Sequence, residues 1–318
     1  MDKLLVTGGS GFIGTNLIDY YLGKNFEVYN LDIKKNMNPK HDSLWLQVDL
    51  LDLNSLRKII AEINPDYVIH LAARTDLGGT HLDDYRVNFD GTENLIKALR
   101  YSKNVKKAVF ASTMYVCKVG YQPVHNEDYC PHTIYGESKV VMEKMIRSNN
   151  LPFEWSIVRP TSIWGPWFGE PYRRFFDIVL NQNYLDIGKH SCTKTYGYVE
   201  NTIFQIDAIL NNKSTLQKTY YLGDYEPIFI SDWAYEIAEI AKVRKPYKVS
   251  YGLMKGLAMT GDFIKLVYKN FPMTRFRLNN MTTDNIFDLT PTREIVGELP
   301  FIRIDGIRKT IQWIKNYN

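Results

Sequence analysis

Hydrophobic and polar positions follow two alternating periods along the first half of the chain. Short apolar runs are typical of strands buried on both faces of a parallel sheet, and stretches with apolar residues at helical spacing separate them. The predicted strands are residues 3–7, 27–32, 44–48, 67–71, 107–111 and 154–159, and the predicted helices are residues 12–22, 53–63, 82–101 and 135–147. This alternation predicts an α/β fold, a doubly wound parallel sheet with helices on both faces.

The pattern changes after Arg159-Pro160. Aromatic loops follow, strands become fewer and helices dominate. We therefore expect residues 1–160, together with about 198–212, to form the sheet domain. Residues 161–197 and 213–318 should form a smaller, mostly helical domain that supplies the substrate pocket.

A glycine loop lies between the first predicted strand and the first predicted helix. Gly8 suits the tight turn, Gly11 a close approach of a pyrophosphate to the backbone, and Gly14 close packing of helix on sheet. Phe12 and Ile13 begin the helix, whose free N–H groups favour an anion. With a strand before it and a helix after it, the loop predicts a dinucleotide site in a Rossmann domain, although glycine spacing alone is weak evidence.

Asp32 ends the second predicted strand and indicates which dinucleotide binds. A carboxylate there accepts hydrogen bonds from the adenosine ribose and repels a 2′-phosphate, so NAD is favoured over NADP. Lys34 and Lys35 follow closely and would stabilise such a phosphate, but solvated loop charges explain them better.

Tyr135 and Lys139 are four residues apart on a predicted helix and therefore share one face. Such a pair often occurs by chance on a surface. Downstream of a dinucleotide loop it predicts a tyrosine that exchanges a proton with substrate. A nearby lysine cation and the positive nicotinamide ring are expected to lower the pKa of this phenol.

Further motifs make the chain similar to the extended short-chain dehydrogenase/reductase family, and in particular to its nucleotide-sugar epimerase/dehydratase group. They are Val48-Asp49-Leu50, His70-Leu71-Ala72-Ala73, Val87-Asn88-Phe89-Asp90-Gly91-Thr92, Ala111-Ser112-Thr113, Arg159-Pro160-Thr161 and residues 306–314. The resemblance covers nearly the whole chain. It implies that Tyr135 is the acid/base, that Lys139 holds the nicotinamide ribose, and that Thr113 rather than Ser112 hydrogen-bonds the reacting oxygen. It also implies a cofactor groove formed by Asp49, Leu50, Leu71, Ala72, Ala73, Asn88 and Pro160.

Departures from the family pattern narrow the reaction. Met114 and Tyr115 stand where dehydratases carry an Asp-Glu pair and decarboxylases a glutamate, so both reactions are disfavoured. Cys117 replaces a tyrosine and fits a pocket or core position better than a reactive thiol. Lys194 replaces the family's diphosphate-binding arginine, keeping the charge but losing the bidentate fork.

Substrate contacts are expected from Thr113, Met114, Tyr135, Lys194 and Arg277. Arg275 is an alternative to Arg277 as a second phosphate contact. Residues 251–271 are more apolar than a sugar enzyme needs. A lid helix explains them best, and a site for an apolar substrate or an edge that rests on a membrane remains open.

Composition adds mainly exclusions. The net charge of +4 and the absence of a basic, aromatic-rich run argue against nucleic-acid binding. The three cysteines, with no metal-ligand spacing, suit a reducing cytoplasm without a metal site. No apolar stretch reaches the length of a membrane span.

The sequence thus predicts an NAD-dependent epimerase that passes a nucleotide-activated sugar through a keto intermediate. Its alternatives are a keto-sugar reductase, a dehydrogenase of a sterol-like alcohol, and a catalytically silent protein that senses dinucleotide. By family analogy, we expect a homodimer that pairs the helices near residues 82–101 and 135–147.

Overall fold

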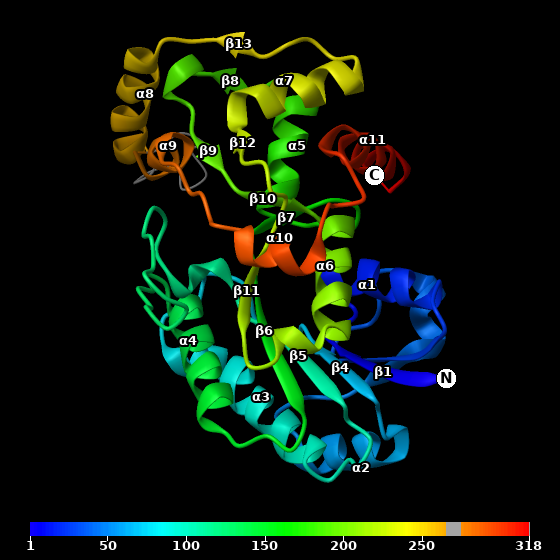
Figure 1. The fold of residues 1–318 in the computed structure, drawn as a ribbon. Helices are drawn as coiled ribbons and strands as arrows, with labels where there is room; N and C mark the ends of the chain where they lie inside the picture. The colour runs from blue at the N-terminus through cyan, green and yellow to red at the C-terminus, as the bar shows by residue number, and fades with distance from the viewer. Residues whose placement is uncertain (265–274, 318) are drawn as a thin grey trace.

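Seven parallel strands form the central sheet of the computed structural model, which describes residues 1–264 and 275–317. Their order is β11-β6-β5-β4-β1-β2-β3 (Figure 1). The strands are β1 (Asp2–Thr7), β2 (Phe26–Asp32), β3 (Trp45–Gln47), β4 (Tyr67–His70), β5 (Lys107–Ala111), β6 (Glu154–Pro160) and β11 (Thr219–Leu222). Because β1 leads outward to β2 and β4 leads outward to β5 in the other direction, a crevice opens at their carboxyl ends.

Helices cover both faces of this sheet, which confirms the doubly wound α/β fold. On one face α1 (Phe12–Leu22) packs beside α6 (Val199–Asn211). On the other face α3 (Arg86–Leu99) lies between α2 (Leu53–Ile63) and α4 (Ile134–Ser148). The predicted helix at residues 82–101 begins with a 3-10 turn, Leu82–Tyr85, before α3.

Side-chain caps explain where two of these helices begin. The Asp52 carboxylate accepts from the backbone N–H groups of Asn54 and Ser55, each at 3.1 Å, just before α2. The Thr133 hydroxyl oxygen accepts from the N–H of Gly136 at 3.0 Å and caps α4. Both caps satisfy donors that a helix leaves open at its start.

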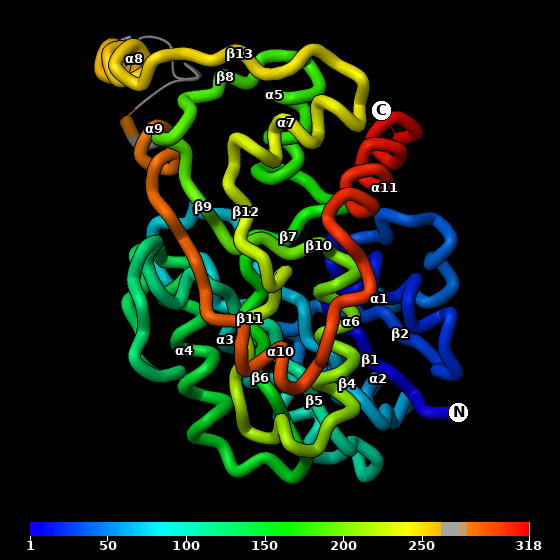
Figure 2. Tube along the Cα trace, turned by 45° about the horizontal axis from the view of Figure 1, so that its top comes forward, coloured from blue at the N-terminus to red at the C-terminus, as the bar shows by residue number. Residues whose placement is uncertain are grey.

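The remaining chain forms a second layer above the carboxyl ends of the strands (Figure 2). Its short strands pair as β7 (Ser162–Trp164) with β10 (Tyr196–Tyr198), β9 (Thr193–Lys194) with β12 (Ile228–Phe229), and β8 (Leu185–Asp186) with β13 (Tyr247–Lys248). Its helices are α5 (Tyr172–Leu180), α7 (Ile230–Ala241), α8 (Tyr251–Ile264), α9 (Arg275–Thr282), α10 (Thr290–Val296) and α11 (Arg303–Asn316). The C-terminal region is therefore mostly helical, as expected.

Strand β11 corrects the predicted division of the chain. We expected residues 213–318 in the substrate region. Thr219–Leu222 instead pair in parallel with residues 157–160 of β6 and complete the main sheet. The reason is the length of the run: four residues cannot be recognised as a sheet strand without their partner.

Two large hydrophobic clusters stabilise the fold. One lies between the sheet and α2, α3 and α4 and includes Leu5, Leu56 and Ile96. The other begins between the sheet and α1, at Leu4 and Leu17, and continues without a break into the second layer, where it includes Trp164 and Trp233. The sheet and the second layer therefore share one core.

Candidate active site

The glycine loop at the end of β1 is tight enough to require its glycines. Gly8 has φ of +74°, and a Cβ there would lie 2.5 Å from the backbone nitrogen of Ala72. A Cβ on Gly14 would overlap the carbonyl oxygen of Gly8. Gly11 differs, because a Cβ there would meet protein only at the Gly8 carbonyl oxygen, 3.3 Å away. The protein's own packing thus demands two glycines and leaves room beside the third.

The start of α1 offers that room a set of donors. No side chain caps this helix, so the first N–H groups, which include those of Phe12 and Ile13, have no side-chain partner. Open N–H groups at a helix N-terminus, together with the positive end of the helix dipole, favour a phosphate or pyrophosphate. The residues present therefore fit the pyrophosphate of a dinucleotide.

Asp32 lies beside the glycine loop at the end of β2. Its carboxylate accepts from the N–H of Ser10 at 3.1 Å and from the N–H of Lys34 at 2.9 Å. Partial burial raises the pKa of Asp32, and these hydrogen bonds act in the opposite direction. The side chain is thus held next to the loop, at the position where a Rossmann domain contacts the adenosine ribose.

His70 forms a buried relay at the crevice between β1 and β4. The Thr92 hydroxyl donates to the Asn88 carbonyl at 2.8 Å, so it accepts from His70 Nε2 at 2.8 Å, and Nδ1 accepts from the Thr7 hydroxyl at 2.6 Å. Burial lowers the pKa of His70 to about 3, so the ring stays neutral. The relay fixes the end of β4, from which Leu71, Ala72 and Ala73 extend, each partly buried.

Asn88 was expected in the cofactor groove, and the structure gives its amide other partners. The Oδ1 atom accepts from the N–H of Arg74 at 2.8 Å, and Nδ2 donates to the Arg74 carbonyl at 3.0 Å and to Ser138 Oγ at 2.9 Å. Ser138 Oγ in turn donates to the Tyr135 carbonyl at 2.7 Å. Asn88 therefore ties the segment after β4 to the helix that carries Tyr135.

Tyr135, Thr113 and Lys139 come together at the carboxyl end of β5. A 3-10 turn, Met114–Val116, follows Thr113 and packs against the first turn of α4. Gly136 permits this approach, since a Cβ there would overlap the Tyr115 carbonyl oxygen. Thr113 lies near enough to the Tyr135 side chain to oppose the raising of its pKa, and Lys139 Nζ donates to the Ala111 carbonyl at 2.8 Å. The buried Ser112 Oγ has no hydrogen-bond partner among the described residues, and Thr113 is the hydroxyl residue that acts on Tyr135.

Burial governs the protonation of both α4 residues. It raises the pKa of Tyr135 to about 12, against a lowering effect of Thr113. It lowers the pKa of Lys139 to about 7, against a raising effect of Glu143. The lowering expected from the lysine cation and the nicotinamide ring together is not seen in the protein by itself, where burial raises the pKa of Tyr135. The lysine points to Ala111 and Met142, and its charge is itself disfavoured by burial.

Sequence reasoning missed a buried ion pair beneath the site. Glu143 and Arg159 have no exposed side-chain area, and the guanidinium binds the carboxylate through two hydrogen bonds, Nε to Oε1 at 2.8 Å and Nη2 to Oε2 at 2.7 Å. The Tyr129 hydroxyl donates to the same carboxylate at 3.0 Å. Glu143 is four residues after Lys139, so the pair lies one helical turn from that lysine. The sequence signal for this ion pair was Arg159 itself, a charged residue within a predicted strand that is buried in the sheet.

Aromatic rings and a methionine surround Tyr135. The ring centroids of Tyr85 and Tyr115 lie 6.1 and 6.3 Å from that of Tyr135. The Tyr172 side chain is buried near Tyr115 and Ser162, and burial raises the pKa of its phenol. Met114 is almost fully buried, and its sulfur lies 4.0 Å from Ser162 Oγ and 3.9 Å from Asn285 Nδ2. The wall next to Tyr135 is therefore neutral and largely apolar.

The other predicted residues have varied positions. Lys194 Nζ donates to the Asn280 carbonyl of α9 at 2.7 Å, and the side chain of Arg277 lies outside the described residues. Asp49 is exposed and accepts from the N–H of Leu51, Leu50 is buried, and Pro160 ends β6 half-buried.

Burial raises the pKa of the Cys117 thiol, which donates to the Asp128 carbonyl at 3.4 Å, so it lacks the character of a reactive thiolate.

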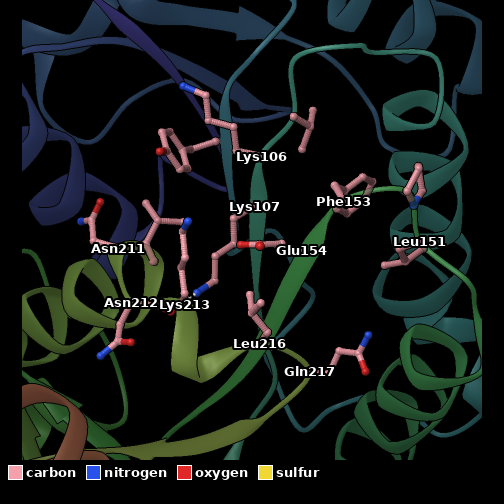
Figure 3. Close-up of a pocket in the computed structure, with 14 residues that line it drawn as sticks. Lys106, Lys107, Leu151, Phe153, Glu154, Asn211, Asn212, Lys213, Leu216 and Gln217 are labelled. Atoms are coloured by element: carbon pink, nitrogen blue, oxygen red, sulfur yellow. Dashed lines mark hydrogen bonds between the residues drawn. The ribbon is translucent and has the colours of Figure 1, made fainter.

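A cavity of about 610 Å³ lies at the amino ends of the strands, at the other end of the sheet from Tyr135 (Figure 3). Tyr67, Lys107 and Glu154, which line it, are the first residues of β4, β5 and β6. Lys107 Nζ already donates to the carbonyls of Ile209 and Asn212, at 2.5 and 2.9 Å. Ligands of open α/β sheets bind at the carboxyl ends, so we place the active site at Tyr135 and not in this cavity.

Within 1–264 and 275–317, no group of three His, Cys, Asp or Glu side chains is placed to hold a metal ion. In that same part of the chain, no helix has the length and hydrophobicity needed to cross a bilayer.

Comparisons with known proteins agree with this geometry. The chain is 28% identical to a 3β-hydroxysteroid dehydrogenase/Δ5→4-isomerase of Mycobacterium tuberculosis, over 94% of this chain and 86% of the relative. It is 27% identical to an N-acetyl-α-D-glucosaminyl-diphospho-ditrans,octacis-undecaprenol 4-epimerase of Escherichia coli O157:H7, over 98% and 95%. Its fold matches the crystal structure of a UDP-glucose 4-epimerase from Thermotoga maritima with a TM-score of 0.77, at 18% identity and 99% coverage of both chains.

A match to a protein-family model shows which family the chain belongs to. The model of the NAD-dependent epimerase/dehydratase family matches residues 4–223, which span the glycine loop, Asp32, Thr113, Tyr135 and β11. This confirms the resemblance stated from the sequence and identifies NAD as the cofactor, for which the loop and the open start of α1 are a fitting site. The chain is an enzyme of the NAD-dependent epimerase/dehydratase family.

Proposed function

We propose that the enzyme epimerises a nucleotide-activated sugar through a transient keto intermediate. The observation that carries the proposal is the grouping of Tyr135, Thr113 and Lys139 at the carboxyl edge of the sheet, next to a glycine loop that fits a dinucleotide. The glycine loop and the open start of α1 would hold NAD, which would supply the hydride chemistry at the sugar carbon. The protein's own residues orient the sugar and move the proton.

Tyr135 is the proposed acid/base. Its phenolic oxygen takes the proton of the sugar hydroxyl as the ketone forms and gives it back as the ketone is reduced. Because burial holds the pKa of Tyr135 at about 12, the phenolate needs a positive neighbour, and the nicotinamide cation is the one that the family's cofactor brings. Thr113 donates a hydrogen bond to the reacting oxygen. Lys139 holds the cofactor ribose, and its buried setting keeps water from the reaction.

The residues after Thr113 support epimerisation over elimination. Removal of water or of a carboxylate needs an acid or base beside the reacting carbon. Met114 and Tyr115 occupy that position, and burial raises the pKa of Tyr115 further above its ordinary value. The name of the relative from Escherichia coli, an epimerase of a diphosphate-linked sugar, supports the same reaction type.

A second candidate is net dehydrogenation of a sterol-like alcohol. It uses the same three residues but releases reduced cofactor. The neutral wall formed by Met114, Tyr115 and Tyr172 favours it, because a nucleotide diphosphate needs cations, and Lys194 is hydrogen-bonded to α9. The hydroxysteroid dehydrogenase among the relatives supports it too.

Three further expectations belong to the proposal. The substrate region comprises residues 161–197 and the part of 213–318 that lies outside the sheet. The enzyme is a homodimer that pairs α3 and α4, which light scattering of the purified protein tests. Its location is the cytoplasm, in keeping with cysteines that are all free.

The deciding experiment incubates the purified enzyme and NAD with a panel of nucleotide-sugars and, separately, of sterols. Products are resolved by NMR while the absorbance of reduced cofactor is followed. Inversion of one sugar carbon without net reduction of NAD is the expected result. Stoichiometric formation of NADH with a sterol would replace the first candidate by the second. If bound NAD supported neither reaction, a silent dinucleotide sensor would be the better description.

A further inference from the structure

Helix α8 lies at the outer end of the second layer, away from the central sheet (Figures 1 and 2). Leu253, Leu257 and Met259 are 57%, 41% and 44% exposed. The opposite face of the helix is buried at Met254 and Ala258, which pack on Leu278 of α9. The helix therefore already has its core contact, and the exposed face is a second apolar surface.

That second face has almost no charge. Between Tyr251 and Gly261, Lys255 is the one charged residue, and the exposed positions beside the three apolar side chains are Gly252, Gly256 and Thr260. A helix face in contact with water ordinarily carries several charged side chains. Glycines and a threonine between larger apolar groups instead leave a smooth surface.

A basic segment leads into this helix. Residues 242–261 contain five cations, Lys242, Arg244, Lys245, Lys248 and Lys255, and no aspartate or glutamate. All five are exposed, and the stretch alone exceeds the net charge of +4 of the whole chain. The neighbouring acid Asp186 is buried and accepts from Ser231 and Tyr235, so it does not neutralise the segment.

We propose that the exposed side of α8, hereafter called the α8 surface, docks on anionic phospholipid membranes. It has Leu253 and Leu257 on one flank and Met259 on the other, and Lys245 and Lys248 precede it in the chain. An apolar helix face flanked by cations and by the exposed ring of Tyr247 matches the interface between headgroups and acyl chains. Fourteen residues of helix span about 21 Å, less than the roughly 30 Å of a bilayer core, so α8 lies in the interface and does not cross it.

Contacts connect the α8 surface to the active site. Helix α9 packs on α8 and receives Lys194 Nζ at the Asn280 carbonyl, and the following segment brings Asn285 to the sulfur of Met114. A bilayer on the α8 surface would thus be connected to the wall of the substrate pocket through α9 and the segment that follows it. The inference does not depend on which alcohol the enzyme oxidises, since membrane binding is measured without substrate.

Vesicle flotation of the purified full-length protein tests the proposal. Phosphatidylcholine vesicles that contain phosphatidylglycerol should carry the protein at about 0.1 M salt. Binding should drop strongly at about 1 M salt, where the Debye length shrinks from about 10 Å to about 3 Å, and with vesicles of phosphatidylcholine alone. Each cation near an anionic surface strengthens binding about fivefold, so Lys245→Glu/Lys248→Glu should weaken it by more than about tenfold.

A second double variant, Leu253→Glu/Leu257→Glu, should weaken vesicle binding by about tenfold through the loss of apolar contact. The matched control is Ile302→Glu, which changes an apolar residue that is 64% exposed before α11, away from α8, and should bind as the wild type does. Because the lysine pair is exposed, it serves as the test if the leucine variant misfolds. Absence of flotation, or equal flotation of wild type and both double variants, would overturn the proposal. The proposal would also be overturned if the wild-type protein bound no vesicles and the leucine variant converted a dimer to monomers. The α8 surface would then be a contact between two copies of the chain.

Discussion

Helices α4 and α8 depart from the ordinary distribution of polarity in opposite directions. Helix α4 buries charged groups: Lys139 and Glu143 have almost no exposed area. Helix α8 exposes apolar groups, with Leu253 more than half accessible. Charged groups belong on surfaces and large apolar groups belong in cores, unless another requirement outweighs the free energy of transfer.

The two helices differ in where the compensating partners of their unusual side chains lie. On α4, every buried charge has partners within the fold, such as Arg159 for Glu143 and the Ala111 carbonyl for Lys139. The requirement there is internal, an active site with fixed geometry. On α8, the described residues supply no partner for the outward face, so the requirement lies outside the chain. We therefore relate the buried charges of α4 to the candidate active site and the exposed apolar side chains of α8 to the proposed docking surface.

The largest expected effect is the loss of the proposed proton-transfer group on α4. Replacing Tyr135→Phe should lower kcat by about 10²- to 10⁴-fold, the usual contribution of a general acid/base, and should leave NAD binding intact. Kinetics and a cofactor titration measure both. The matched control is Tyr115→Phe, which removes a hydroxyl from the neighbouring ring and should cost less than about tenfold. Full activity of the Tyr135 variant would disprove the assignment.

Breaking the buried pair beneath the site should have the next largest effect. The change Glu143→Gln leaves the Arg159 cation buried without a counter-ion and should lower the free energy of unfolding by about 3–5 kcal/mol. Urea unfolding measures it. As control, Glu298→Gln interrupts the exposed pair with Arg293 and should change nothing measurable. Equal stability of the two variants would mean that the pair on α4 is not desolvated.

The Lys139 ammonium provides a test with a definite sign. Its pKa is lowered by burial from 10.5 to about 7, so between these values the unfolded chain binds a proton that the folded chain does not. Wild-type stability should therefore fall as the pH decreases from about 10.5 to about 7. The variant Lys139→Met lacks this penalty.

At neutral pH, Lys139→Met should be the more stable protein by on the order of 3 kcal/mol, and the difference should vanish near pH 10.5. Unfolding curves across this range measure it, and its activity should be lost even as its stability rises. A difference that did not change with pH would show that Lys139 is solvated.

The smallest effects should distinguish the two faces of α8. Replacing the buried Met254→Ala should lower the free energy of unfolding by about 2 kcal/mol. Replacing the exposed Leu257→Ala should change it by less than about 0.5 kcal/mol. Thermal unfolding of the purified variants compares them. A comparable loss at Leu257 would show that the outward face is covered in solution.

Features with a local signature were predictable from the sequence. The strands and helices of the first half follow from hydrophobic periodicity, and the four-residue spacing of Tyr135 and Lys139 places both on one helix face. The glycine loop is recognisable because its strand and helix flank it. Gly8 and Gly14 then prove to be required by contacts with Ala72 and with the loop itself.

Features that depend on distant partners were not predictable. The ion pair of Glu143 with Arg159 joins a helix to a strand, and β11 becomes a strand only through β6. The hydrogen bonds of the Asn88 amide with Arg74 and Ser138 likewise join segments that are far apart in the sequence. Burial, which the sequence does not state, sets the pKa values of Tyr135 and Lys139.

The late return of the chain to its sheet limits how the enzyme can be divided. After β6 the polypeptide builds a wall of the pocket, comes back as α6 and β11, and leaves again for the upper layer. Cutting the chain after Pro160 would strip the sheet of an edge strand and uncover the apolar face that α6 protects. Cofactor and substrate regions are therefore not interchangeable modules. A new specificity has to arise by changing side chains and loops within one cooperative folding unit.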